Sequence, residues 1–163
     1  GHRDPAHEAL AREFAALCAR AAFDSRYAEN IEQVLWDKWT FLATLAGMTT
    51  ACRASIGEIV AAPYGRELVG AMYAECLAVA AKSGFPVGED ASAKALGLLT
   101  QAGSSFTASM LRDLESGQRT EYPHILGALI ERAEALGSPA PLLKLAHTHM
   151  DIHDRQRRPG ARP

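Results

Sequence analysis

The stretch "LWDKWTFLATLAG" (residues 35–47) has the spacing of a helix with one apolar side, and a lysine lies within that side. At 3.6 residues per turn, one side of the helix collects six apolar residues. They are Ile31, Val34, Leu35, Phe41, Leu42 and Leu45. Lys38 lies at the centre of the same side, three or four residues from its apolar neighbours. Packing gives no reason for an ammonium group there, so Lys38 is a candidate functional residue.

The bulk composition limits the class of protein. The chain has 163 residues, 48% hydrophobic and 22% charged, which suits one globular domain with a core. A net charge of −2 gives no electrostatic reason to expect nucleic acid or an anionic membrane as a partner. No apolar run approaches the ~20 residues of a membrane span, and no secretory signal is visible. We therefore predict a cytoplasmic protein.

The three cysteines point to the same compartment. Cys18, Cys52 and Cys76 are odd in number and lack the spacing of a metal site. They predict three free thiols in a reducing environment.

Helical periodicity runs through almost the whole sequence, and Gly84, Gly117 and Gly137 stand where helices should end. The pattern predicts an all-α fold of roughly eight helices, the last beginning at Pro139 or Pro141. The expected helices cover residues 5–23, 29–51, 55–62, 64–83, 90–101, 110–116, 121–136 and 139–153. The expected organisation is a junction helix in 1–23, an all-α domain in 24–154 and a disordered basic tail in 155–163.

Lys38 allows two interpretations. Its aliphatic stem could lie on the apolar surface while the ammonium reaches water, which is common for lysines. Alternatively, the apolar side forms the roof of a functional cleft. An ammonium group that is withdrawn from water gives up its proton more readily and makes a good general acid.

A second stretch, "SSFTASMLRDLESGQRTEYPHILG" (residues 104–127), contains two further candidates. Ser109 and Asp113 are four residues apart on one helix face. Glu121 falls in the first turn of the next helix, where the helix dipole favours a carboxylate. Taken alone, this stretch is better explained as a routine joint between two helices.

The third stretch, "HTHMDIHD" (residues 147–154), pairs His147 with Asp151 and His149 with His153 at four-residue spacing on a helix. Such spacing occurs at metal sites. No second ligand cluster accompanies it, so a solvated, histidine-rich helix end is the preferred interpretation. We predict no bound metal.

A dinucleotide-binding motif is absent. The sequence has no G-x-G-x-x-G and no strand-rich pattern around its glycines. We infer that the chain does not by itself form a dinucleotide-binding half.

Two of these stretches together resemble a known family. "ENIEQVLWDKWTFLATLAG", followed about seventy residues later by "SSFTASMLRDLESGQRTEYPHILGALIERAEALGSPAP", is similar to the C-terminal domain of ketopantoate reductases (2-dehydropantoate 2-reductases). The shared pattern is a Trp-x-Lys helix, Ser-Met-x-x-Asp-Leu, Gly-x-x-Thr-Glu, a Gly-containing helix and a Pro loop. Order and spacing agree over residues 24–152.

The resemblance implies one half of a two-domain enzyme related in fold to 6-phosphogluconate dehydrogenase. The N-terminal Rossmann domain, which binds NADPH, would be absent from this chain, and the fragment alone would be inactive. The all-α half would bind a small 2-keto acid and form homodimers, with no nucleic-acid or membrane partner. The family reaction reduces ketopantoate to pantoate in pantothenate biosynthesis.

The resemblance also implies roles for three residues. Lys38 would donate a proton to the developing alkoxide, where a nearby cation stabilises the transition state. Ser109 would bind the substrate. Glu121 would contact the nicotinamide ribose and lie within a few ångströms of Lys38. No residue would bind metal.

Two positions depart from the family pattern. Ketopantoate reductases have substrate-binding asparagines one and two turns after the lysine, where this chain has Leu42 and Ala46. Neither can hydrogen-bond a polar substrate, which predicts a different keto acid with a more apolar tail. The alternative is a helical dimerisation or interaction module that has lost catalysis.

Overall fold

A computed structural model of the chain describes residues 1–157. Within these residues the fold is entirely helical, with eight α-helices and no strand, as the sequence predicts. The helices are α1 (Glu8–Cys18), α2 (Ile31–Cys52), α3 (Ile56–Ala61), α4 (Gly65–Lys82), α5 (Glu89–Leu99), α6 (Ser109–Glu115), α7 (Ala128–Ala135) and α8 (Pro141–Arg157). A 3-10 turn, η1 (Pro5–His7), precedes α1, and a π-helical turn, η2 (Pro123–Gly127), leads into α7.

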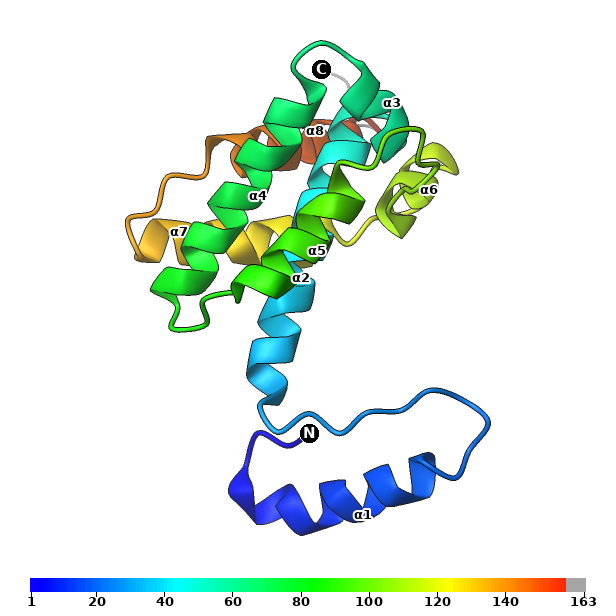
Figure 1. Cartoon of the computed structure of the whole chain (residues 1–163). Coiled ribbons are helices and arrows are strands. Elements are labelled where there is room, and N and C mark those ends of the chain that lie inside the picture. The colour runs from blue at the N-terminus through cyan, green and yellow to red at the C-terminus, as the bar shows by residue number, and fades with distance from the viewer. Residues whose placement is uncertain (158–163) are drawn as a thin grey trace.

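Helix α2 is the central element of the bundle (Figure 1). It packs against α3, α4, α5, α6, α8 and η2. Every residue from 43 to 50 is buried, and the threonines among them donate their hydroxyl hydrogens to carbonyls one turn earlier in the same helix. The hydroxyl groups of these three threonines are therefore hydrogen-bonded inside the core by their own helix.

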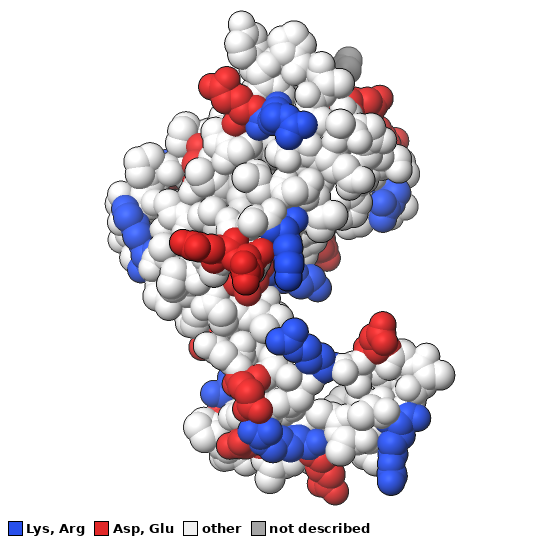
Figure 2. All heavy atoms as spheres, in the orientation of Figure 1, with Lys and Arg blue, Asp and Glu red and all other residues white. Residues whose placement is uncertain are grey.

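The beginning of α2 (residues 31–35) extends out of the bundle and carries the N-terminal arm (residues 1–30), whose helix α1 lies apart from the other helices (Figure 1). Arg12 holds the arm together: its guanidinium bonds Glu8 at 2.8 Å and Glu29 at 2.8 and 3.1 Å, and it lies over the ring of Tyr27. No residue of α1 is buried. Its apolar side is left exposed at Leu10, Phe14 and Leu17. Figure 2 shows the resulting hollow between the arm and the bundle.

Local capping explains where several helices begin. Asn30 caps α2 by accepting the N–H of Gln33 at 3.1 Å. Ser55 and Glu58 form a capping box at α3, in which the Ser55 side-chain and backbone donors hold the pKa of the Glu58 carboxyl below its ordinary value.

The structure corrects two expected boundaries. The first helix ends at Cys18 rather than residue 23, and the segment that follows reaches α2 in extended and bent backbone. The last helix continues to Arg157, so the predicted basic tail is helical over residues 155–157. Arg155 pairs with Asp151 at 2.8 Å, and Arg157 donates to the carbonyl of Gln118 at 2.7 Å, which extends the helix. The rest of the predicted tail, residues 158–163, lies outside the described residues.

Over the described part of the chain, no helix combines the length and hydrophobicity that crossing a membrane requires.

Candidate active site

Lys38 lies on the first half of α2 and is exposed. Val34 and Leu35, its apolar neighbours one turn earlier, are each 43% exposed, so this part of the stripe is not covered by the bundle. The ammonium is therefore not withdrawn from water in this chain. Lys38 instead stands on an uncovered apolar surface, which agrees with the solvent-reaching interpretation.

Ser109 is the first residue of α6, and the segment before it is firmly attached to the bundle. The carbonyls of Ser104 and Phe106 accept the N–H groups of Gly57 and Ile56 at 2.8 and 3.0 Å. A Cβ atom on Gly57 would come within 2.5 Å of the Ser104 nitrogen, so this contact requires glycine. The Ser109 side chain is therefore exposed at the end of a rigid segment.

The same segment lies along α2. Phe106 stacks on Phe41 with ring centroids 6.1 Å apart, and the N–H of Ala108 reaches Thr49 Oγ1 at 3.4 Å. Phe106 is 40% exposed and Phe41 is partly buried, so the two rings form an aromatic wall beside α2.

Glu121 is exposed and immediately precedes Tyr122 and the π-helical turn η2. A π turn is wider than an α turn and leaves carbonyls free of their usual helical partners. The carbonyl of Ile125, in this turn, accepts the indole N–H of Trp39 at 3.0 Å. Trp39 follows Lys38 directly, so this bond ties the lysine's turn of α2 to the segment that follows Glu121.

Helix geometry shows how these segments flank Lys38. Successive residues are rotated by about 100°, so Phe41 and Trp39 lie on opposite flanks of the lysine. One flank meets the segment that leads to Ser109, and the other meets η2. The fold thus carries all three candidates on elements packed against α2. No ion pair joins Lys38 and Glu121 within residues 1–157, so the expected close approach of these two side chains is not formed here.

The two positions that depart from the family's asparagines have different surroundings. Leu42 is partly exposed beside Lys38, whereas Ala46 is only 2% exposed and lies in the core. Of the two, only Leu42 is accessible in this structure, because the bundle covers the second turn after the lysine. That either residue lines a substrate pocket stays a prediction.

The histidine-rich helix end is occupied by contacts within the protein. Asp151 accepts the Tyr122 hydroxyl at 3.2 Å in addition to its pair with Arg155. His153 lies 3.3 Å from Arg53, and burial together with the Arg53 charge lowers the pKa of His153. In residues 1–157, no three His, Cys, Asp or Glu side chains form a group that could hold a metal ion.

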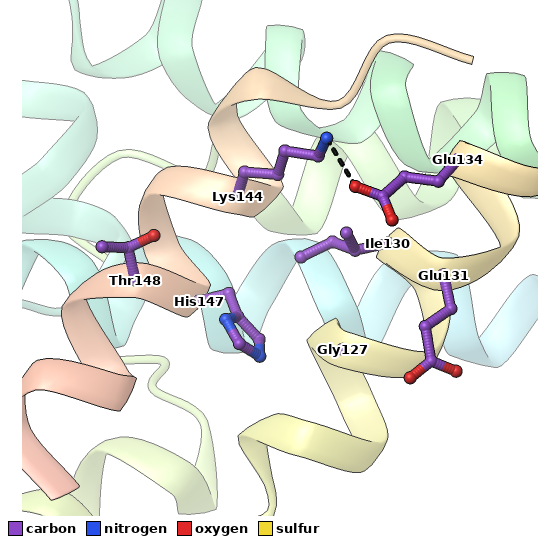
Figure 3. A pocket seen from close by; sticks show the side chains of 7 residues that line it. All are labelled: Gly127, Ile130, Glu131, Glu134, Lys144, His147 and Thr148. Atoms are coloured by element: carbon purple, nitrogen blue, oxygen red, sulfur yellow. Dashed lines mark ion pairs between the residues drawn. The ribbon is translucent and has the colours of Figure 1, made fainter. Parts of the chain in front are cut away.

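His147 instead lines a cavity of about 320 Å³ between α8 and the η2–α7 segment (Figure 3). Its ring packs edge-on against Tyr122, with 4.9 Å between ring centroids. Lys144 and Glu134 form a 2.8 Å ion pair at the same cavity. Lys38, Ser109 and Glu121 do not line this cavity.

The three cysteines are free thiols, as predicted. Cys76 is fully buried beside Thr44, and burial raises the pKa of its thiol to about 12. Such a thiol is a packing residue and a poor nucleophile.

Sequence reasoning missed Trp39 and the aromatic wall. The aromatic residues on either side of Lys38 are visible in the sequence. Their partners are not predictable from it, because Phe106 lies 65 residues after Phe41 and Ile125 lies 86 residues after Trp39.

The all-helical domain, with Lys38, Ser109 and Glu121 on elements packed against α2, can be compared with known protein families. The family model for the ketopantoate reductase (PanE/ApbA) C-terminal domain matches residues 30–152. The chain therefore belongs to the ketopantoate reductase family, as the C-terminal helical domain.

Two relatives from the curated proteins illustrate the match. The chain is 30% identical over 157 residues to the uncharacterized oxidoreductase YkpB of Bacillus subtilis, covering 96% of this chain and 50% of that protein. It is 32% identical over 108 residues to a 2-dehydropantoate 2-reductase of Archaeoglobus fulgidus, covering 66% and 36%. The chain thus spans about half, or less, of the length of these relatives.

Solved structures share the fold. A 2-dehydropantoate 2-reductase from Methylococcus capsulatus superposes with a TM-score of 0.81 at 25% identity, over 94% of this chain and 53% of that one. A dimeric ketopantoate reductase from Staphylococcus aureus gives 0.80 at 20% identity, over 91% and 52%. A complex of D-mandelate dehydrogenase with NADH gives 0.80 at 17% identity, over 94% and 53%.

Proposed function

We propose that this chain is the substrate-binding half of a nicotinamide-dependent 2-keto acid reductase, acting together with a dinucleotide-binding domain. One observation carries the proposal: Lys38 stands on an uncovered apolar surface, flanked by the segments that bear Ser109 and Glu121. A lysine whose role is structural usually forms an ion pair or packs its aliphatic stem against the protein. An exposed ammonium on an apolar face instead suits a site that a second domain closes.

The proposed roles follow the chemistry of carbonyl reduction. When bound, the nicotinamide cofactor supplies the hydride that adds to the keto carbon. Lys38 holds a proton on Nζ and delivers it to the carbonyl oxygen as negative charge develops there. Ser109 orients the substrate through its exposed hydroxyl.

Glu121 suits a contact with a ribose hydroxyl, because its carboxylate is exposed and forms no ion pair within residues 1–157. The residues described here contain no strand leading into a glycine-rich phosphate loop. We therefore expect the rest of the cofactor, with NADPH preferred, to be bound outside this chain.

The surroundings of Lys38 favour an apolar substrate tail. Leu42 replaces a hydrogen-bonding side chain, and Phe41 and Phe106 add an aromatic wall on the same side. A pocket that cannot pair a substrate hydroxyl discriminates against substrates that carry one. The D-mandelate dehydrogenase named above has the same fold, and mandelate is an aromatic 2-hydroxy acid. We propose a branched or aromatic 2-keto acid rather than ketopantoate.

The test is a panel of 2-keto acids assayed with NADPH and with NADH, using the full-length protein that contains this domain. We expect the highest kcat/KM for a keto acid with an apolar tail. Clear preference for ketopantoate would contradict the substrate proposal while supporting the reductase. Absence of turnover with every keto acid would contradict the reductase itself.

A second candidate function is a dimerisation or interaction module without catalysis. The exposed apolar residues of α1 favour it, because such surfaces commonly mark interfaces. Homodimers and a cytoplasmic location fit both candidates and stay predictions. Size-exclusion chromatography with light scattering would determine the oligomeric state of the chain.

A further inference from the structure

A second feature lies beside the proposed site and plays no part in its chemistry. Arg132, in the last turn of α7, holds its guanidinium 5.4 Å from the ring centroid of Trp36 and 5.7 Å from that of Trp39. The two indoles are neighbours, with centroids 5.0 Å apart. A cation over aromatic faces is attracted by their electron density, so the two rings keep this guanidinium in place.

The platform beneath the guanidinium is rigid. Trp36 is 8% exposed and stacks on Phe85 with centroids 5.6 Å apart. The indole N–H of Trp39 is bonded to the Ile125 carbonyl. Both rings are thus held by contacts that do not involve Arg132, and the exposed arginine side chain lies over a fixed aromatic surface.

The charge of Arg132 is not matched by a carboxylate. None of the ion pairs or side-chain hydrogen bonds found in residues 1–157 involves the guanidinium of Arg132. The acidic side chain at this place, Glu32, already pairs with Arg3 at 3.6 Å. Two guanidinium groups and one carboxylate therefore leave one positive charge in excess.

These groups surround a cavity of about 100 Å³, lined by Arg3, Glu32, Leu35, Trp36, Trp39 and Arg132. That volume corresponds to roughly three water molecules. It is sufficient for one oxyanion group and too small for a nucleoside or an extended acid. Lys38, Ser109 and Glu121 do not line it, so it is separate from the proposed keto acid site.

We propose that this cavity is an anion site for a phosphate group, with Arg132 as its principal ligand. A guanidinium presents N–H donors in a planar fork that matches two oxygens of a phosphate, and here the guanidinium lies over the two indole rings. The phosphate is either free in solution or the terminal group of a larger molecule whose remainder lies outside the cavity.

The chain provides its own probe for this proposal. Trp36 and Trp39 are its only two tryptophans, and both contact Arg132. Binding of inorganic phosphate at constant ionic strength should give a saturable change in tryptophan fluorescence. Phosphorus NMR line broadening of the added phosphate gives a second readout that does not depend on the indoles.

Variants assign the response to the site. Arg132→Gln should weaken phosphate binding by about tenfold or more, since it removes a charged donor. Arg132→Lys should weaken it less. Arg66→Gln, which changes an exposed arginine on α4, is the matched control and should bind like the parent chain. Far-ultraviolet circular dichroism confirms that each variant is folded.

Titrations with AMP and with inorganic phosphate distinguish a terminal phosphoryl group from the free ion. A response to AMP equal to that with phosphate supports a terminal phosphoryl group, and a response to phosphate alone supports the free ion. An equal response to chloride or acetate, an unsaturable titration, or unchanged binding by Arg132→Gln in both readouts would overturn the proposal.

Discussion

Glu75 and Lys82 lie two turns apart on α4 and bind opposite ends of the connection between α7 and α8. The Glu75 carboxylate accepts the N–H groups of Leu142 and Leu143 at the start of α8, both at 3.0 Å. Lys82 Nζ donates to the carbonyls that end α7, at 3.0 Å to Gly137 and 3.4 Å to Leu136. Each side chain matches the sign of the helix end that it meets.

Replacing Glu75 should therefore destabilise the domain. Glu75→Ala leaves two helix-terminal N–H groups without their carboxylate, at a cost of about 1–3 kcal/mol in free energy of unfolding. Urea denaturation followed by circular dichroism measures it. Glu67→Ala, an exposed change in the first turn of the same helix, is the control. Equal stability of the two variants would show that the contact contributes nothing.

Lys38→Ala should separate catalysis from folding in the full-length protein. A proton donated in the transition state acts on kcat, so we expect kcat to fall by about 10²–10⁴-fold with a much smaller change in KM. Thermal unfolding should be nearly unchanged because Lys38 is exposed. Lys94→Ala, on α5, serves as the control. A change confined to KM would assign Lys38 to binding alone.

The isolated 163-residue chain should not bind NADPH appreciably. Its described residues contain no strand leading into a glycine-rich phosphate loop, and the cavity at Arg132, about 100 Å³, has room for one phosphate group and not for a dinucleotide. Isothermal titration calorimetry of the chain, with the full-length protein as positive control, tests this expectation. Micromolar binding by the chain alone would contradict the division of the cofactor site between two domains.

The histidine-rich end of α8 should contain no stoichiometric metal. Asp151 is already bonded to Tyr122 and Arg155, and in residues 1–157 no three possible ligands form a group that could hold a metal ion. Metal analysis of protein purified without an affinity tag is the measurement. A metal present at one equivalent and lost in His149→Ala would contradict it.

His153 should make the domain less stable on mild acidification. Burial and the neighbouring Arg53 lower the pKa of His153 in the folded state, whereas the unfolded chain takes up that proton near its ordinary value of about 6.5. The unfolded state then binds more protons, so stability falls as the pH decreases from about 6.5 to the folded-state value. His153→Gln should flatten this part of the profile of unfolding free energy against pH.

Local sequence signals predicted much of the fold. The glycines at 84, 117 and 137 adopt positive φ angles of 89°, 73° and 57° just past helix ends, where only glycine is comfortable. The periodicity around Lys38 placed α2 correctly, and Ser109 and Glu121 were found at the starts of consecutive elements.

Features that depend on distant partners were not predictable in the same way. The π turn at η2 is stabilised from outside by Trp39, and α8 gains its last turn from a bond to Gln118. The exposure of Lys38 depends on which part of its stripe the bundle covers. Periodicity finds an apolar face, but it does not say how far along the helix that face is packed.

The packing of α2 from Trp36 onward also has a mechanical consequence. Trp36 is 8% exposed and stacks on Phe85, so it fixes the helix in the bundle, while Ile31 lies five residues, or about 7.5 Å, further out. A rotation of about 10° around Trp36 would therefore move Ile31 by about 1.3 Å, whereas Lys38 lies on the packed side of this pivot. The N-terminal arm can change its angle to the bundle while the lysine backbone stays almost stationary.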